Sequence, residues 1–400
     1  MLKIGFHSQV HSDKLKQELL HVRPIIFKSL NLSDIGFFYW LKTNLPDCFV
    51  IGREWWQSQP YQDDPELWGA QKADSILHYQ AVREGLIDAV ESHNEPLAGD
   101  VPTAHWYLYD RFQAMFYDTI KTAGVKAEPV ALNAGTGNLL GPGVVEAFGE
   151  TLARYRLYGY HEYDWPTLWR LHDYGLSKAN EPDKWFPGGE QRGDGGCWLA
   201  LRYRRIHSYI RQVRPDALAL ITEFGITNAV VAGADVGYTT RPGQASTPEA
   251  YWADSIRRYN DEICKDDYLL GATLFQVGGD DSWKTFEVLH SGYFMERLAE
   301  LSPGTAPIRL DKPIEPEEPT MTEWHGRFAD MAAERPKYMG KPTNEATYFV
   351  HNDKQYAIQS SENGCEALWD SESDVGRLLM PKLARGPEGK TEFIKSPFRR

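Results

Sequence analysis

Short apolar runs alternate along the chain with longer stretches in which apolar residues recur every three or four positions. A short run predicts a buried strand, and the longer period predicts an amphipathic helix. Strands are predicted at 3–7, 24–29, 48–53, 86–92, 127–133, 157–161, 218–223 and 269–277. Helices are predicted at 12–22, 34–43, 65–84, 104–123, 144–155, 198–213, 248–263 and 293–301. Eight strand-then-helix units predict an α/β protein with a closed (β/α)8 (TIM) barrel.

The pattern changes near residue 301. Five prolines follow in a short acidic stretch, at Pro303, Pro307, Pro313, Pro316 and Pro319. They predict a semi-rigid linker over 303–320 after a barrel domain at 1–302. Residues 321–400 are expected to form a small extension of unknown role, with short strands at 346–358 and around Ala367 and a flexible tail.

Composition narrows the choice of partner. The formal net charge is −13, and 42% of the residues are hydrophobic. This balance is typical of a soluble globular protein and speaks against nucleic acid or an anionic membrane surface as a partner. We see neither a membrane span nor a signal peptide, and therefore expect a cytoplasmic protein or one whose export signal is absent from this sequence. Nothing indicates the oligomeric state.

Cysteines and motifs give no sign of a metal or cofactor. Cys48, Cys197, Cys264 and Cys365 are widely spaced, which favours isolated thiols over a zinc site or a disulfide framework. No H-E-x-x-H, P-loop or dinucleotide motif occurs. We predict no catalytic metal and no cofactor.

The active sites of such barrels lie where the strands end. Two glutamates occupy that position: Glu95 follows the fourth predicted strand, and Glu223 ends the seventh. Strands four and seven face each other across the barrel mouth, so the two carboxyl groups can meet. Retaining cleavage of a glycosidic bond needs two carboxyl groups about 5–5.5 Å apart. The alternatives are a helix-starting carboxylate for Glu95 and an exposed rim charge paired with Arg53 for Glu223.

The segments S-H-N-E-P at 92–96 and I-T-E-F-G at 221–225 resemble the clan-A glycoside hydrolases, which are (β/α)8 retaining enzymes such as cellulases, mannanases, xylanases and β-galactosidases. The resemblance implies that Glu95 is the general acid/base and Glu223 the nucleophile. It also implies that Asn94 binds the sugar 2-hydroxyl and orients the nucleophile.

The segment Y-H-E-Y at 160–163 resembles the H-x-Y of cellulase-like members of this clan. The resemblance places His161 beside the substrate and the Tyr163 hydroxyl on the nucleophile. Such a hydroxyl would favour the charged form of Glu223 and lower its pKa.

Further candidates for substrate binding come from strand ends. Arg53 can hold a carboxylate of the pair, or pair with Glu54 or Glu91. His7 and His93 can line the sugar-binding subsite, with a polar core histidine as the alternative for each.

Aromatic residues at the same rim suggest stacking platforms for sugar rings. Trp55, Trp165 and Trp283 are the candidates, and packing of loops onto the barrel is the alternative. From these residues we expect a β-linked poly- or oligosaccharide as substrate and endo-acting cleavage.

Two positions depart from the clan pattern. The second strand carries Lys28 where an arginine is common, and the eighth lacks its usual tryptophan, which leaves Phe275, Gln276 or Trp283 as candidates. A third carboxylate, Glu91, is expected deeper in the barrel than Glu95.

Two other functions stay open: a non-catalytic barrel that binds glycan, and a barrel enzyme of other chemistry that uses a Schiff-base lysine or a metal.

Overall fold

The computed structural model describes residues 1–97, 101–138, 143–164, 168, 199–227, 247–279, 281–302, 306–310, 347–351, 354–360, 366–370 and 375–379. The chain divides into two compact units, Met1–Asp311 and Lys312–Arg400. Within the described residues, no helix is both long and apolar enough to cross a membrane.

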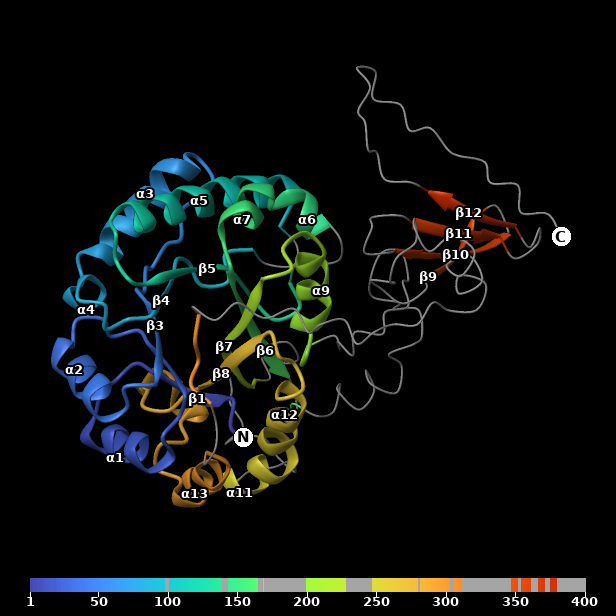
Figure 1. Ribbon diagram of the computed structural model, residues 1–400. Helices are drawn as coiled ribbons and strands as arrows, with labels where there is room; N and C mark the ends of the chain where they lie inside the picture. Colours follow the sequence, from blue (N-terminus) through green and yellow to red (C-terminus); the bar gives the residue numbers. More distant parts are fainter. Residues whose placement is uncertain are drawn as a thin grey trace. The chain divides into compact units, whose positions relative to one another are not determined.

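The first unit is a closed barrel in which each parallel strand pairs with the next along the chain and β8 pairs with β1. Its strands are β1 (Ile4–Ser8), β2 (Ile26–Ser29), β3 (Phe49–Arg53), β4 (Ala89–Glu91), β5 (Glu128–Ala134), β6 (Leu157–Asp164), β7 (Leu218–Ile226) and β8 (Leu269–Phe275). Figure 1 shows the helices around the outside of these strands. The predicted (β/α)8 barrel is confirmed.

The helices of the barrel cover its outer face (Figure 1). They are α1 (Asp13–Val22), α2 (Ile35–Asn44), α3 (Pro65–Leu77), α4 (Gln80–Arg83), α5 (Thr103–Thr122), α6 (Gly143–Ala147), α7 (Gly149–Arg154), α9 (Tyr203–Val213), α11 (Pro248–Tyr251), α12 (Arg257–Ile263) and α13 (Gly292–Leu301). Several begin at a side-chain cap: Ser12, Asp64 and Ser291 each accept a hydrogen bond from a backbone N–H of the first turn.

Three predicted helices are interrupted. The stretch 65–84 forms α3 and α4, and 144–155 forms α6 and α7, where Phe148 leaves the helical conformation just before Gly149. Glycine has a low helix propensity, which agrees with a break at this point. The stretch 248–263 contains a π-helical segment, Trp252–Ile256, between α11 and α12.

Register shifts occur in the strands that carry predicted site residues. In β5 the shift lies between Ala131 and Ala134, and in β6 between Tyr160 and His161. A bulge re-aims the side chains that follow it. After the shift in β6, the Cα atoms of His161 and Glu223 are direct partners on neighbouring strands.

Part of the predicted linker packs against the barrel. Ile308 is buried, Arg309 pairs with Asp47, and the Arg156 guanidinium donates to the Leu310 carbonyl. Residues 311–320 lie outside the described part of the chain, as does the tail at 381–400.

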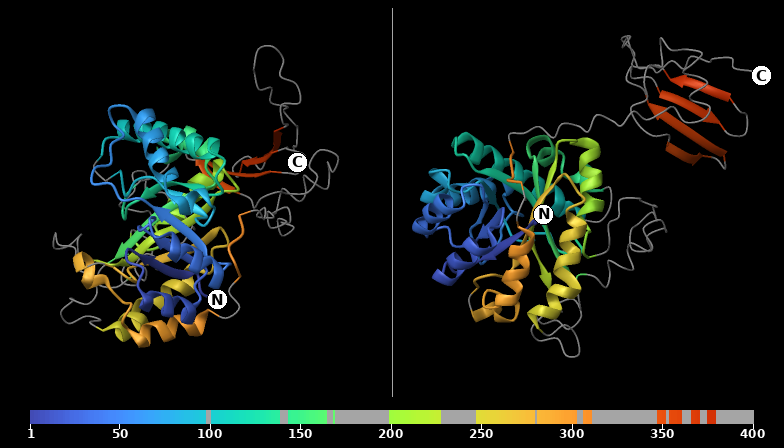
Figure 2. Two further views of the ribbon diagram at one scale, coloured as in Figure 1. Left: turned by 90° about the vertical axis from the view of Figure 1, so that its left-hand side faces the viewer. Right: turned by 60° about the horizontal axis from the view of Figure 1, so that its bottom comes forward.

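The second unit contains a four-stranded antiparallel sheet in the order β12-β11-β10-β9 (Figure 2). Its strands are β9 (Thr347–His351), β10 (Lys354–Ser360), β11 (Glu366–Asp370) and β12 (Val375–Leu379). The stretch predicted as strand at 346–358 contains two strands, β9 and β10, and residues 352–353 between them lie outside the described part of the chain. The strand around Ala367 is β11, and β12 was not predicted.

Candidate active site

A pocket of about 350 Å³ opens at the carboxyl ends of the barrel strands. Both predicted catalytic glutamates line it. The lining residues are Gln9, Leu30, Arg53, Trp55, Asn94, Glu95, Thr136, Asn138, Tyr163, Glu223, Thr227, Phe275, Trp283 and Phe286. Carboxylates, amides and aromatic rings therefore meet in one hollow, at the end of the barrel where catalytic residues of this fold lie.

Glu223 is the more enclosed of the two glutamates, with 7% of its surface exposed. Its Oε1 accepts hydrogen bonds from Arg53 Nη1 at 2.8 Å and from Lys28 Nζ at 3.1 Å. Its Oε2 accepts from the Tyr163 hydroxyl at 3.0 Å. The alternative of an exposed rim charge is thus excluded: Glu223 pairs with Arg53, but inside the barrel.

Electrostatics keep Glu223 ionised. Burial by itself raises the pKa of this carboxyl, but electrostatic interactions with His161, Lys28 and Arg53 outweigh burial and hold the pKa well below its usual range. At neutral pH the group is a carboxylate, and it is held by donors on both oxygens.

Glu95 lies in a different environment, on the loop after β4. Its backbone φ is +48°, and its side chain is 37% exposed. His161 Nδ1 lies 2.7 Å from Glu95 Oε1. The next described helix, α5, begins only at Thr103, so Glu95 is not in the first turn of that helix.

Gly135 leaves room for Glu95. A Cβ atom at position 135 would lie 3.0 Å from Glu95 Cδ and 2.8 Å from Asn138 Nδ2. Any larger residue would push against the glutamate side chain, so the loop after β5 helps to define where Glu95 lies.

His161 connects the two glutamates. The same Nδ1 atom that contacts Glu95 lies 3.7 Å from Glu223 Oε2. Because one atom touches both groups, the nearest oxygens of Glu95 and Glu223 are no farther apart than the sum of 2.7 and 3.7 Å. Thr136 holds this part of β6, since its Oγ1 donates to the His161 carbonyl and accepts from Tyr163 N.

Asn94 joins the same network through Arg53, whose Nη1 donates to Asn94 Oδ1. Gln59, which the sequence analysis missed, fixes the backbone of Asn94: its amide accepts from Asn94 N and donates to Asn94 O at 2.7 Å. Gln59 belongs to the loop after β3, where no sequence pattern marks such a role.

Arg53 does not pair with Glu54, so that alternative was wrong. Glu54 instead accepts from Lys72 at 3.1 Å, from Ser75 at 2.7 Å and from the Trp56 indole at 2.7 Å. Arg53 Nη1 lies 3.8 Å from Glu91 Oε2, farther than from Glu223. Arg53 is therefore directed at the nucleophile candidate.

None of the three histidines predicted at the sugar site, His7, His93 and His161, is among the lining residues of the pocket. His7 is fully buried, with Nδ1 3.7 Å from Glu223 Oε1, and its burial and the nearby Lys28 lower its pKa well below the usual range. His93 stacks on Phe112 of α5, and its Nε2 contacts the Pro60 carbonyl at 3.1 Å. Because β4 ends at Glu91, His93 lies beyond the strand, and it packs as the polar core histidine that was the alternative.

The aromatic candidates divide as follows. Trp55 is 65% exposed and lines the pocket together with Trp283. Phe275, at the end of β8, also lines it, with ring centroids 5.6 Å from Trp283 and 6.4 Å from Tyr163. Gln276 turns away and donates to the Trp283 carbonyl. Trp165 lies outside the described residues.

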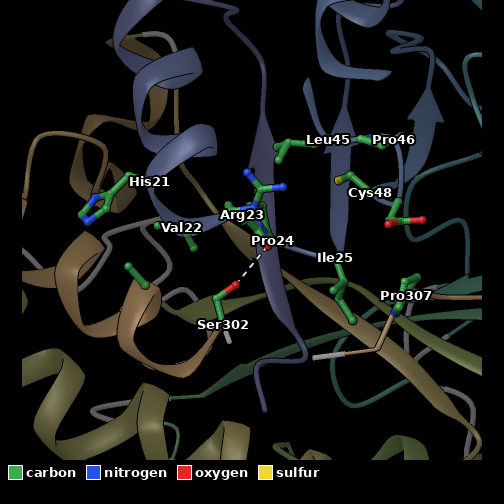
Figure 3. Close-up of a pocket in the computed structure, with 12 residues that line it drawn as sticks. His21, Val22, Arg23, Pro24, Ile25, Leu45, Pro46, Cys48, Ser302 and Pro307 are labelled. Carbon is green, nitrogen blue, oxygen red and sulfur yellow. Dashed lines mark hydrogen bonds between the residues drawn. The ribbon is translucent and has the colours of Figure 1, made fainter. Parts of the chain in front are cut away.

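A second cavity, of about 380 Å³, lies at the opposite end of the barrel (Figure 3). His21, Cys48 and Ser302 are among its lining residues, and the Ser302 hydroxyl donates to the Arg23 carbonyl. Burial raises the pKa of Cys48 to about 12, so its thiol is protonated. Among the described side chains, no group of three or more His, Cys, Asp and Glu is arranged to hold a metal ion.

No family model and no curated protein matches the sequence. Among solved structures, a family 39 glycoside hydrolase from Bacteroides cellulosilyticus is 10% identical, with a TM-score of 0.48, over 95% of this chain and 73% of that one. The GH53 catalytic domain from Ignisphaera aggregans is 14% identical, with a TM-score of 0.42, over 74% of this chain and 92% of that one. A monomeric β-xylosidase from Caulobacter crescentus is 11% identical, with a TM-score of 0.40, over 90% of this chain and 73% of that one. Such distant similarity concerns the fold, and function has to be argued from the site.

Proposed function

We propose that this chain is a retaining glycoside hydrolase that cleaves a β-linked poly- or oligosaccharide, with Glu223 as nucleophile and Glu95 as general acid/base. The observation that carries the proposal is the contact of one histidine nitrogen with both carboxyl groups, at 2.7 and 3.7 Å. Two carboxyl groups so close at the rim of a barrel match the requirement of double displacement.

The spacing of the two carboxyl groups is compatible with retention. Retaining enzymes hold their carboxyl groups about 5–5.5 Å apart, whereas inverting glycosidases keep them about 6.5–9.5 Å apart to admit a water molecule. The contacts of His161 keep the nearest oxygens of Glu95 and Glu223 within the sum of 2.7 and 3.7 Å, a bound that admits the retaining separation. The burial and ionisation of Glu223 support its direct attack on the anomeric carbon.

The environments of the two glutamates support the division of roles. Glu223 is buried, ionised and held by three donors, as a nucleophile needs to be. Glu95 is more exposed, and among the described side chains it forms a hydrogen bond only with His161, so it can exchange a proton with a leaving oxygen and later with water. Environments that differ in this way separate an acid from a nucleophile.

The reaction then has two steps. Glu223 attacks the anomeric carbon while the carboxyl proton of Glu95 passes to the departing glycosidic oxygen, which gives a covalent glycosyl-enzyme. Glu95, now a carboxylate, takes a proton from water, and the water oxygen attacks the anomeric carbon and releases Glu223. Asn94 Oδ1 is occupied by Arg53, which leaves the Asn94 amide nitrogen to bind a sugar hydroxyl.

Aromatic rings at the pocket support a carbohydrate ligand. Trp55 and Trp283 belong to different strand ends and both line the pocket, and flat rings of this kind bind the apolar faces of sugars. The exposed Trp55 is suited to a sugar unit next to the one that is cleaved, which favours an oligomeric substrate and endo-acting cleavage.

The test is hydrolysis of β-glucan, mannan, xylan, galactan and aryl β-glycosides by wild type and by Glu223→Gln, Glu95→Gln and Glu146→Gln. Glu146 is exposed on α6 and serves as the matched control. We expect activity in wild type and in the control, and loss in Glu223→Gln. Glu95→Gln should keep more activity on aryl glycosides with acidic leaving groups, which need no proton. Hydrolysis that survives Glu223→Gln would contradict the assignment, and glycan binding without hydrolysis by wild type would favour a binding protein.

A further inference from the structure

A buried ion pair lies next to the nucleophile candidate. Lys28 Nζ, from β2, is 2.7 Å from Glu91 Oε2 of β4 and 3.1 Å from Glu223 Oε1 of β7. The side chains of Lys28 and Glu91 are both fully buried, and neither residue lines the pocket. Neither can touch a substrate, so any effect on catalysis has to pass through Glu223.

The charged surroundings of Glu223 can be named element by element. His7 comes from β1, Lys28 from β2, Arg53 from β3 and Glu91 from β4, while β8 contributes the uncharged Phe275. The loop after β4 adds Glu95, and β6 adds His161 and Tyr163, the groups described above. Lys28 and Arg53 therefore face two buried carboxylates, Glu91 and Glu223.

Glu91 is held in its charged form. Burial raises the pKa of Glu91, but Lys28 and Arg53 outweigh it and keep the pKa below its usual value. An ammonium group as deeply buried as that of Lys28 is stable only with carboxylate partners. If Lys28 alone were lost, Glu91 would face Glu223 as a second buried negative charge, and Arg53 and His161 would have to offset both.

We propose that Lys28 and Glu91 act as a positioning pair for the nucleophile: Lys28 fixes Glu223 Oε1 as a carboxylate, and Glu91 fixes the Lys28 ammonium and offsets its charge. This inference rests on the proposed function of Glu223. It implies that the two residues are coupled, so that removal of Glu91 should repair part of the damage caused by removal of Lys28.

The test is the pH profile of kcat/KM for Lys28→Met, Glu91→Gln and the double variant, with the exposed Lys126→Met as control. The acidic limb of this profile reports ionisation of the nucleophile in the free enzyme. Loss of a close opposite charge raises a carboxyl pKa by about 1–3 units, so the acidic limb of Lys28→Met should move to higher pH by about that much. In the double variant more than half of this shift toward higher pH should disappear. In Lys28→Arg the acidic limb should lie near its wild-type pH.

A purely structural pair predicts something else. Each substitution would then lower the yield of folded protein or the melting temperature, and the limb would not move; that result overturns the proposal. It is also overturned if the double variant is shifted as far as Lys28→Met. If Lys28→Met does not fold, Lys28→Gln with and without Glu91→Gln gives the same comparison. Failure of the proposed function is a separate result, because wild type would then hydrolyse no glycoside at all.

Discussion

Removal of the Tyr163 hydroxyl tests how the site controls its nucleophile. Tyr163→Phe deletes the donor that lies 3.0 Å from Glu223 Oε2 and leaves Arg53 and Lys28 on Oε1. Burial and the two nearby glutamates raise the pKa of Tyr163 well above its usual value, so the hydroxyl is protonated and donates. The ring itself stays in place, since only one oxygen is removed.

The size of the effect follows from the charge on the acceptor. A hydrogen bond to a charged group contributes about 1.5–3 kcal/mol. At about 1.36 kcal/mol for each pKa unit, its loss should raise the pKa of Glu223 by about one to two units. Because the wild-type pKa lies well below the usual range, the carboxylate of the variant should begin to protonate at a higher pH than that of wild type.

The assay is kcat/KM for an aryl β-glycoside between about pH 3 and pH 8, in wild type, Tyr163→Phe and the control Tyr107→Phe, whose ring is half exposed on α5. We expect the acidic limb to move to higher pH in Tyr163→Phe and to stay unchanged in the control. An unshifted limb in a folded Tyr163→Phe variant would refute the role assigned to this hydroxyl.

Three further predictions concern other parts of the unit. Gly135→Ala places a Cβ atom 3.0 Å from Glu95 Cδ and should displace this acid, so kcat should fall more for substrates with poor leaving groups than for those with good ones. Gly149→Ala is the control, because its Cβ meets no atom within 4 Å. An equal loss of kcat for both kinds of leaving group would refute this. Trp55→Ala should raise KM for longer oligosaccharides and leave kcat on aryl glycosides nearly unchanged, because Trp55 is exposed beside the glutamates; an unaltered KM across chain lengths would contradict it. Burial lowers the pKa of His207 to about 3. Between about pH 6.5 and pH 3 the unfolded chain therefore binds a proton at His207 that the native state does not bind, and the free energy of unfolding should fall as the pH drops through this window. Urea unfolding at several pH values should show that the free energy of unfolding falls less steeply with decreasing pH in His207→Gln than in wild type. Equal slopes in the two proteins would argue against this role of His207.

The sequence predicted the barrel well because its signal is repetitive. Each strand is a short apolar run and each helix an amphipathic stretch, so one misplaced boundary does not change the count of eight. The positions of Glu95 and Glu223 at the barrel mouth followed from that count, since they depend only on which strand each residue follows or belongs to. The interrupted helices show where this reasoning is weakest, because a break such as the one at Phe148 costs little and leaves the periodicity almost unchanged.

The finer geometry of the site was beyond sequence reasoning. The expectation that His93 lines the sugar-binding subsite failed because β4 is only three residues long, and periodicity does not reveal where a strand stops. The register shift that pairs His161 with Glu223 depends on how neighbouring strands pack. The contacts of Gln59 and Lys28 join elements far apart in the chain, and a single sequence carries no signal for such pairs.

The covalent intermediate offers the most direct test of the central claim. Wild type would be incubated with an activated 2-deoxy-2-fluoro-β-glycoside of the sugar found in the substrate panel, digested, and mapped by mass spectrometry. The account predicts that one fluoroglycosyl group is attached to the peptide that contains Glu223, and that Glu223→Gln takes up none. A label on Glu95, or an enzyme that hydrolyses its substrate with inversion and forms no adduct, would contradict it.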